Sequence, residues 1–139
     1  MKSTLSTYSD GASRGNPGPS AVAFIIIGEG GRILKKGSKY VGVRTNNQAE
    51  YQALLLTLES ASKLTEKKVV CHMDSELAVK QLTGEYLVRD AELKVLWLQV
   101  QELVQKFEKV VFVKVPRTDY YIKKVDQIAN EALDKLYVR

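Results

Sequence analysis

The sequence pattern places four carboxylates where a role in a site, rather than simple exposure to solvent, is a reasonable hypothesis: Asp10, Glu50, Asp74 and Asp126. Asp10 and Asp74 each follow a short segment of strand-like composition. Ligand sites in open α/β sheets gather at the carboxyl ends of parallel strands, so acids on two such neighbours would share one crevice. The chain has one histidine and one cysteine, and a site built from carboxylates favours hard cations such as Mg²⁺ or Mn²⁺. Two such ions about 3.5–4 Å apart carry out in-line phosphoryl displacement.

Each of these acids also has a local explanation that needs no metal. Asp10 precedes a glycine as in a turn, Asp74 precedes a serine at a helix start, and Asp126 in the first turn of a helix would answer the helix dipole. Glu50 is harder to explain locally. It lies on the apolar stripe of its helix, four residues before Leu54, and a carboxylate on a buried face is costly unless something compensates it.

The elements that must position these acids follow from the apolar periodicity. The pattern predicts strands over residues 4–9, 21–28, 32–41, 69–73 and 110–115. It predicts helices over residues 46–61, 75–82, 90–107 and 125–136. Clusters of glycine, proline and polar residues predict connections over residues 13–20, 28–31 and 116–124. A meander of three strands followed by strand–helix alternation predicts an α/β fold with a mixed sheet and helices packed on it.

Length and composition narrow the class of protein. A chain of 139 residues predicts a single domain over residues 1–139. No apolar run approaches the roughly 20 residues that span a bilayer, and the first ten residues lack the apolar stretch of a signal peptide, so we expect a cytoplasmic protein. The single cysteine excludes an internal disulfide. A formal net charge of +5 favours a polyanionic partner such as nucleic acid.

Four motifs in this order resemble those of type 1 ribonuclease H. The segment YSDGASRGNPGP at residues 8–19 resembles the opening motif, and TNNQAE at residues 45–50 resembles the second. Asp74–Ser75 resembles the third motif, and Asp126, followed by Ile128 and Ala129, resembles the fourth. The resemblance covers nearly the whole chain. It implies the ribonuclease H-like fold, with a five-stranded mixed sheet whose second strand is antiparallel, flanked by helices.

The resemblance also implies an activity and a site. The family is expected to hydrolyse the RNA strand of RNA–DNA hybrids endonucleolytically, leaving 5′-phosphate and 3′-hydroxyl ends. Asp10, Glu50, Asp74 and Asp126 would be both catalytic residues and ligands of two Mg²⁺ ions, with Mn²⁺ as a substitute. The hybrid would be the partner of a monomeric enzyme. The expected substrate-binding residues are Gly11, Asn16, Arg44, Thr45, Asn46 and Asn47.

Three departures from the family pattern leave points open. The stretch 116–125 has no histidine, where many members place one before the last acid; Lys123, Lys124 and Asp119 are the candidates to replace it. Many members also carry Asn four residues before the last acid, where this chain has Ile122, so Asp119 competes with Asp126 as the fourth ligand. The stretch 82–92 holds Arg89 as its only cation, so the basic helix that some bacterial members use to hold substrate is not expected.

Two alternative functions stay open at this point. One is a duplex-binding module that keeps the fold and has lost turnover; the presence of all four acids argues against it. The other is a nuclease of the same fold that also acts on double-stranded RNA or a DNA junction. Double-stranded RNA shares its A-form shape and its 2′ hydroxyls with a hybrid.

Overall fold

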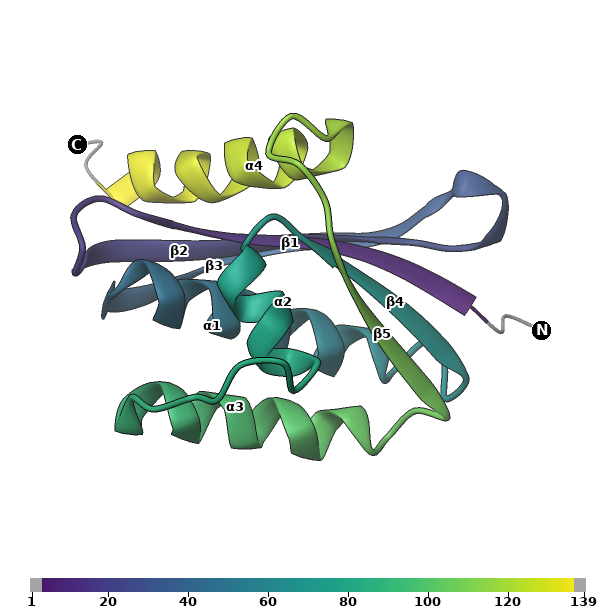
Figure 1. Ribbon diagram of the computed structural model, residues 1–139. Coiled ribbons are helices and arrows are strands. Elements are labelled where there is room, and N and C mark those ends of the chain that lie inside the picture. Colours follow the sequence, from purple (N-terminus) through teal and green to yellow (C-terminus); the bar gives the residue numbers. More distant parts are fainter. Residues whose placement is uncertain (1–3, 137–139) are drawn as a thin grey trace.

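A five-stranded mixed sheet forms the centre of the computed structural model, which describes residues 4–136 (Figure 1). The strand order is β3-β2-β1-β4-β5. β1 pairs with β2 and β2 with β3 in antiparallel fashion, whereas β1–β4 and β4–β5 are parallel. The predicted mixed sheet with an antiparallel second strand is therefore confirmed. The strands are β1 Thr4–Ser13, β2 Gly18–Ile27, β3 Ile33–Arg44, β4 Lys68–Met73 and β5 Lys109–Lys114.

Helices cover both faces of the sheet. The helices are α1 Asn46–Ala61, α2 Glu76–Leu82, α3 Ala91–Val104 and α4 Tyr120–Leu136, with a short 3-10 turn at Glu29–Gly31. Figure 1 shows α1, α2 and α3 on one face of the sheet and α4 on the other. None of the helices within residues 4–136 combines the length and apolar character needed to cross a membrane.

The isoleucine run of β2 explains how one strand serves both layers. Successive side chains of a strand point to opposite faces of the sheet. Ile26 accordingly packs in the core with α1 and α3, while Ile25 and Ile27 pack in a second core with α4. All three are nearly inaccessible to solvent. The run of apolar residues is thus the pattern of a strand buried on both faces, as predicted.

Five predicted ends of strands and helices differ from the structure by three residues or more, among them the end of β3, which continues to Arg44 because Arg44 pairs with Gly18. The connection predicted over 13–20 is shorter, because pairing between β1 and β2 continues to Ser13 and Ser20. Asp10 therefore lies inside β1, three residues before its end. α4 begins at Tyr120, ahead of the predicted start, because Asp119 Oδ1 accepts hydrogen bonds from two main-chain N–H groups of its first turn. α3 ends at Val104, ahead of the predicted 107.

Candidate metal-dependent active site

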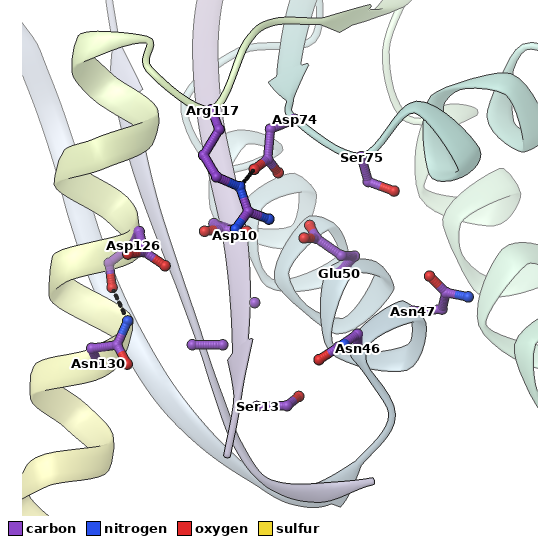
Figure 2. A pocket seen from close by; sticks show the side chains of 12 residues that line it. Asp10, Ser13, Asn46, Asn47, Glu50, Asp74, Ser75, Arg117, Asp126 and Asn130 are labelled. Carbon is purple, nitrogen blue, oxygen red and sulfur yellow. Dashed lines mark hydrogen bonds and ion pairs between the residues drawn. The ribbon is translucent and has the colours of Figure 1, made fainter. Parts of the chain in front are cut away.

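Three acids from three elements converge at one edge of the sheet. Asp10 lies in β1, and Asp74 directly follows β4, the parallel neighbour of β1. The register pairs Tyr8 with His72, so two residues further along the same face both strands present a carboxylate. Glu50 reaches the same point from α1 (Figure 2). One oxygen of each of the three carboxylates lies within 4.8 Å of the other two.

The three carboxylates are buried and only partly satisfied. Asp10 and Glu50 are 5% and 8% exposed, and the side chain of Asp74 is 3% exposed. Oε1 of Glu50 and Oδ1 of Asp74 have no hydrogen-bond partner among residues 4–136. Buried carboxylate oxygens without a donor are costly, and oxygens of this kind are the ligands that Mg²⁺ and Mn²⁺ prefer. The donor set therefore fits a divalent cation.

The pKa values of the acids are shifted in the direction expected of a cation site. Burial, together with the nearby carboxylates of Asp74 and Asp126, raises the pKa of Asp10 to about 7. Burial and the charge of Asp10 raise the pKa of Glu50 well above its ordinary value. Both shifts have the same physical cause, since carboxylates crowded in a poorly solvated place resist carrying their charges together. A bound cation would remove that resistance.

The second motif sets the start of α1 and hence the position of Glu50. Thr45 and Gln48 form a capping box, with Gln48 N–H donating to Thr45 Oγ1 at 3.1 Å and Thr45 N–H donating to Gln48 Oε1 at 3.0 Å. The N–H of Asn46 donates to Asn16 Oδ1 at 2.9 Å, which ties the helix start to the β1–β2 turn. These bonds place Glu50 at the beginning of the second turn of α1.

A glycine keeps β1 and α1 close together. A Cβ atom added at Gly11 would lie 2.6 Å from the carbonyl carbon of Ala49, inside van der Waals contact. Gly11 follows Asp10, and Ala49 precedes Glu50. The absent side chain is therefore what lets the two acids approach each other.

The fourth acid, Asp126, comes from α4, which lies on the opposite face of the sheet from α1 (Figure 1). It is exposed on α4 and lines a pocket of about 390 Å³ together with the three buried acids, with Asn130 one turn further along the helix (Figure 2). Asp126 lies in the second turn of α4, beyond the first turn where the helix dipole favours negative charge most. Its competitor Asp119 is engaged as the cap of α4.

The structure adds a residue that sequence reasoning missed. Arg117 lies in the loop after β5, lines the acid pocket, and donates from Nε to Asp74 Oδ2 at 3.2 Å. The three residues considered for this loop lie elsewhere: Asp119 caps α4, Lys123 is exposed, and Lys124 Nζ lies 5.3 Å from the centre of the Tyr120 ring. The available signal was positional, because β5 runs parallel to β4 and the residues after both strands meet at one edge.

The expected substrate-binding residues occupy two adjacent places. Gly11, Asn46 and Asn47 line the acid pocket itself. Asn16 and Thr45 line a neighbouring pocket of about 500 Å³, which shares Asn46 and Asn47 with the first and is also lined by Asp90, Glu92 and Leu93. Arg44 lies apart, with its Nε donating to the carbonyl oxygen of Val41 at 3.1 Å.

Comparison with known proteins gives three concordant likenesses. A family model described as reverse transcriptase-like matches residues 8–132. Ribonuclease HI of Halobacterium salinarum is 41% identical over 127 residues, which are 91% of this chain and 63% of that protein. A bifunctional protein of Mycobacterium tuberculosis is 35% identical over 126 residues, covering 90% of this chain and 34% of its own length. The chain thus spans less than two thirds of either curated relative.

Solved structures agree with the sequences. The RNase H1 structure from Halobacterium salinarum superposes with a TM-score of 0.90 at 39% identity, covering 95% of this chain and 98% of that one. The structure of LC11-RNase H1 in complex with an RNA/DNA hybrid superposes with a TM-score of 0.89 at 37% identity, covering 96% of this chain and 99% of that one.

Proposed function

This chain belongs to the type 1 ribonuclease H family, and from that premise we propose that it hydrolyses the RNA strand of RNA–DNA hybrids, leaving 5′-phosphate and 3′-hydroxyl ends. The observation that supports this most directly is the trio of buried carboxylates whose oxygens lie within 4.8 Å of one another in a pocket open to substrate. A relative of the same fold, 37% identical, is known in complex with an RNA/DNA hybrid.

We assign the cation ligands to Asp10, Glu50, Asp74 and Asp126, and we propose two Mg²⁺ ions with Mn²⁺ as a substitute. The buried, unpartnered oxygens of Glu50 and Asp74 support the first three assignments. The place of Asp126 on the pocket wall supports the fourth. When bound, such ions activate the attacking water and stabilise the leaving 3′ oxygen. The residues themselves would supply the negative charge, fix the positions of the ligand oxygens and exclude bulk water.

Recognition of the RNA strand falls, in this proposal, to short polar groups beside the acids. A 2′ hydroxyl both donates and accepts, and it distinguishes RNA from DNA at a given position. Asn46 and Asn47 line the acid pocket, and the main chain of Gly11 lies between Asp10 and α1. The side-chain oxygen Oδ1 of Asn16 accepts a hydrogen bond from the N–H of Asn46, so a contact from the Asn16 side chain to the sugar would come from its NH₂ group.

The test is a cleavage panel in Mg²⁺ and in Mn²⁺. We expect the hybrid to be cut and double-stranded DNA to be spared, with cleavage slowing as the ribonucleotide block of a mixed strand is shortened. Asp10→Asn should bind the hybrid without cutting it. Binding without cleavage by the wild type would favour the duplex-binding module, and equal rates on hybrid and double-stranded RNA would favour the broader nuclease. A monomeric state, a single-domain organisation and a cytoplasmic location stay predictions.

A further inference from the structure

Arg14 ties the turn that follows the strand of Asp10 to the helix that carries Asp126. Its Nη2 donates to Asp134 Oδ1 at 2.6 Å and to the main-chain carbonyl oxygen of Asn130 at 3.1 Å. The backbone of Arg14 is itself fixed, because its N–H donates to the carbonyl oxygen of Pro19 across the turn. The bridge therefore joins a rigid part of the sheet to the second half of α4.

The three α4 residues in this arrangement lie on one face of the helix. Asp126, Asn130 and Asp134 are spaced four residues apart, which places them on successive turns. Asn130 Nδ2 donates to the carbonyl oxygen of Asp126 at 3.0 Å, and both residues line the acid pocket. The contacts of Arg14 thus begin one turn away from Asp126.

Asp126 needs such a tie more than the other acids do. Asp10, Glu50 and Asp74 are held by the strand pairing of β1 and β4 and by the close approach of α1. α4 is held to the sheet by an apolar stripe, in which Ile122 and Val125 are buried. Apolar packing is non-directional, so it sets the distance of α4 from the sheet better than it sets the position of the helix along its axis.

We propose that Arg14 is a positioning residue, whose bridge to Asn130 and Asp134 holds α4 where Asp126 completes the cation site. This inference rests on the proposed role of Asp126 as fourth ligand. The side chains of Arg14 and Asp134 are 36% and 64% exposed, and exposed ion pairs contribute little to stability. The contribution of the bridge is geometric, and its loss falls on cation binding.

The direction in which cation affinity changes distinguishes this proposal from a purely electrostatic role of Arg14. Removing a positive charge near an acidic pocket would, through the long-range field alone, strengthen the binding of a divalent cation. Removing a positioning residue weakens it. If the ion pair of Arg14 is merely structural, its removal lowers the melting temperature of the protein and leaves the cation affinity of the folded protein unchanged. The direction of the change therefore separates the three roles.

The experiment is calorimetric titration of Mn²⁺ and Mg²⁺ into the nucleic-acid-free protein. The variants are Arg14→Gln, Arg14→Lys, Asp126→Asn and the double variant Arg14→Gln with Asp126→Asn. Lys67→Gln is the matched control, because Lys67 forms an exposed ion pair with Glu108 at 3.0 Å. Arg14→Lys keeps the charge but replaces the rigid guanidinium, whose Nη2 makes both contacts, by a freely rotating ammonium on a flexible stem. Melting temperatures of the metal-free variants show that each one folds.

We expect Arg14→Gln and Arg14→Lys each to weaken cation binding about tenfold, the scale seen when a group that orients a metal ligand is lost. Lys67→Gln should leave affinity unchanged. In the Asp126→Asn background Arg14→Gln should have little further effect, because the residue it positions is already gone. Unchanged or tighter binding by Arg14→Gln, beside weaker binding by Asp126→Asn, would overturn the role of Arg14 alone. Unchanged binding by Asp126→Asn would overturn the ligand assignment and the inference together.

Discussion

The guanidinium of Arg117 and the carboxylate of Asp74 form an ion pair of very unequal exposure. Arg117 Nε lies 3.2 Å from Asp74 Oδ2, and the two side chains are 87% and 3% exposed. The arginine reaches from solvent onto a buried acid, and its charge lowers the pKa of neighbouring Glu50 against the larger effects that raise it. In the metal-free protein Arg117 therefore supplies part of the positive charge that the acid cluster needs.

Replacing Arg117 by alanine should separate these effects. With its competitor for Asp74 removed, we expect the free protein to bind Mg²⁺ more tightly, by a few-fold. Because the arginine is largely exposed, the free energy of unfolding should fall by only about 0–1 kcal/mol. Calorimetric titration and urea unfolding measure the two quantities, with Arg89→Ala, another exposed arginine, as the control. Weaker Mg²⁺ binding by Arg117→Ala would contradict this account of the ion pair.

Neutral amides at the buried acids should abolish most turnover while sparing the fold. We expect Asp10→Asn, Glu50→Gln and Asp74→Asn each to reduce the rate of hybrid cleavage at least ~10²–10³-fold, the scale for losing one preorganised electrostatic group. Asp126→Asn should also reduce it, whereas Asp119→Asn should affect mainly the stability of α4, because Asp119 is its cap. Single-turnover cleavage and hybrid-binding assays check this. A damaging Asp119→Asn beside a harmless Asp126→Asn would show the fourth ligand misassigned.

The stability of the metal-free protein should carry a pH signature from Asp10. Its pKa is about 7 in the folded state and about 3.9 when unfolded, so the folded state binds the extra proton between these values. The stability this group contributes is complete below about pH 4 and is lost as pH rises through about 7. Asp10→Asn should therefore gain stability relative to the wild type as pH rises from about 4 to about 7, by the order of 1 kcal/mol per pH unit, and the difference should level off above that pH.

Urea unfolding in the presence of a chelator measures this difference. Glu59→Gln, which removes an exposed acid of α1, is the control and should show no such trend. Saturating Mg²⁺ should stabilise the wild type by mass action and Asp10→Asn less, because the variant has lost one ligand. An Asp10→Asn protein that becomes less stable than the wild type toward pH 8 would contradict a crowded acidic site.

The close approach of β1 and α1 should make Gly11→Ala costly. The added methyl group would meet the backbone of Ala49, which cannot rotate away. We expect a loss of about 1–3 kcal/mol of stability, typical of overpacking, together with weaker cation binding because Asp10 and Glu50 are pushed apart. At Gly37 an added Cβ meets only the Phe24 ring, at 3.0 Å, so Gly37→Ala should leave cation binding intact. Equal Mg²⁺ affinities in the two variants would refute the role of this contact.

Salt should weaken hybrid binding through a small number of phosphate contacts. If roughly four phosphates are neutralised, the logarithm of affinity should fall with the logarithm of salt concentration at a slope of about −3 to −4. Titrations of a catalytically silent Asp10→Asn protein at several salt concentrations give the slope. A slope near zero would mean that the excess of lysine and arginine is a solvated surface and that other contacts hold the hybrid.

Most of the fold was predictable because its signals are local. The isoleucine run of β2 and the repeating leucines of α1 mark buried faces. The errors fell where a tertiary contact or a side chain overrode local composition. Pairing with Ser13 extends β2 into a segment of glycine and proline, and the Asp119 cap draws Tyr120 into α4.

The site was predictable only in part. Asp10, Glu50 and Asp74 stand in motifs or on a buried stripe, so their convergence could be expected from the strand order that the motifs imply. Arg117 has only a positional signal, and Arg14 stands in the opening motif without a role that the resemblance implies, because an arginine in a loop is most often solvated. Their roles depend on distances to Asp74 and Asp134, which are separated from them by 43 and 120 positions of sequence.

The place of β1 at the centre of the sheet has a kinetic consequence. β2 can join β1, and β3 can join β2, through short turns, but the parallel partner of β1 begins with Lys68 opposite Thr4. Bringing such distant segments together costs chain entropy before any stabilising contact forms between them. Pairings of this kind therefore form slowly. The carboxylates of Asp10 and Asp74 meet only once that pairing exists. During refolding, we expect high-affinity cation binding to recover after the hairpins have formed, so that it reports on completion of the sheet.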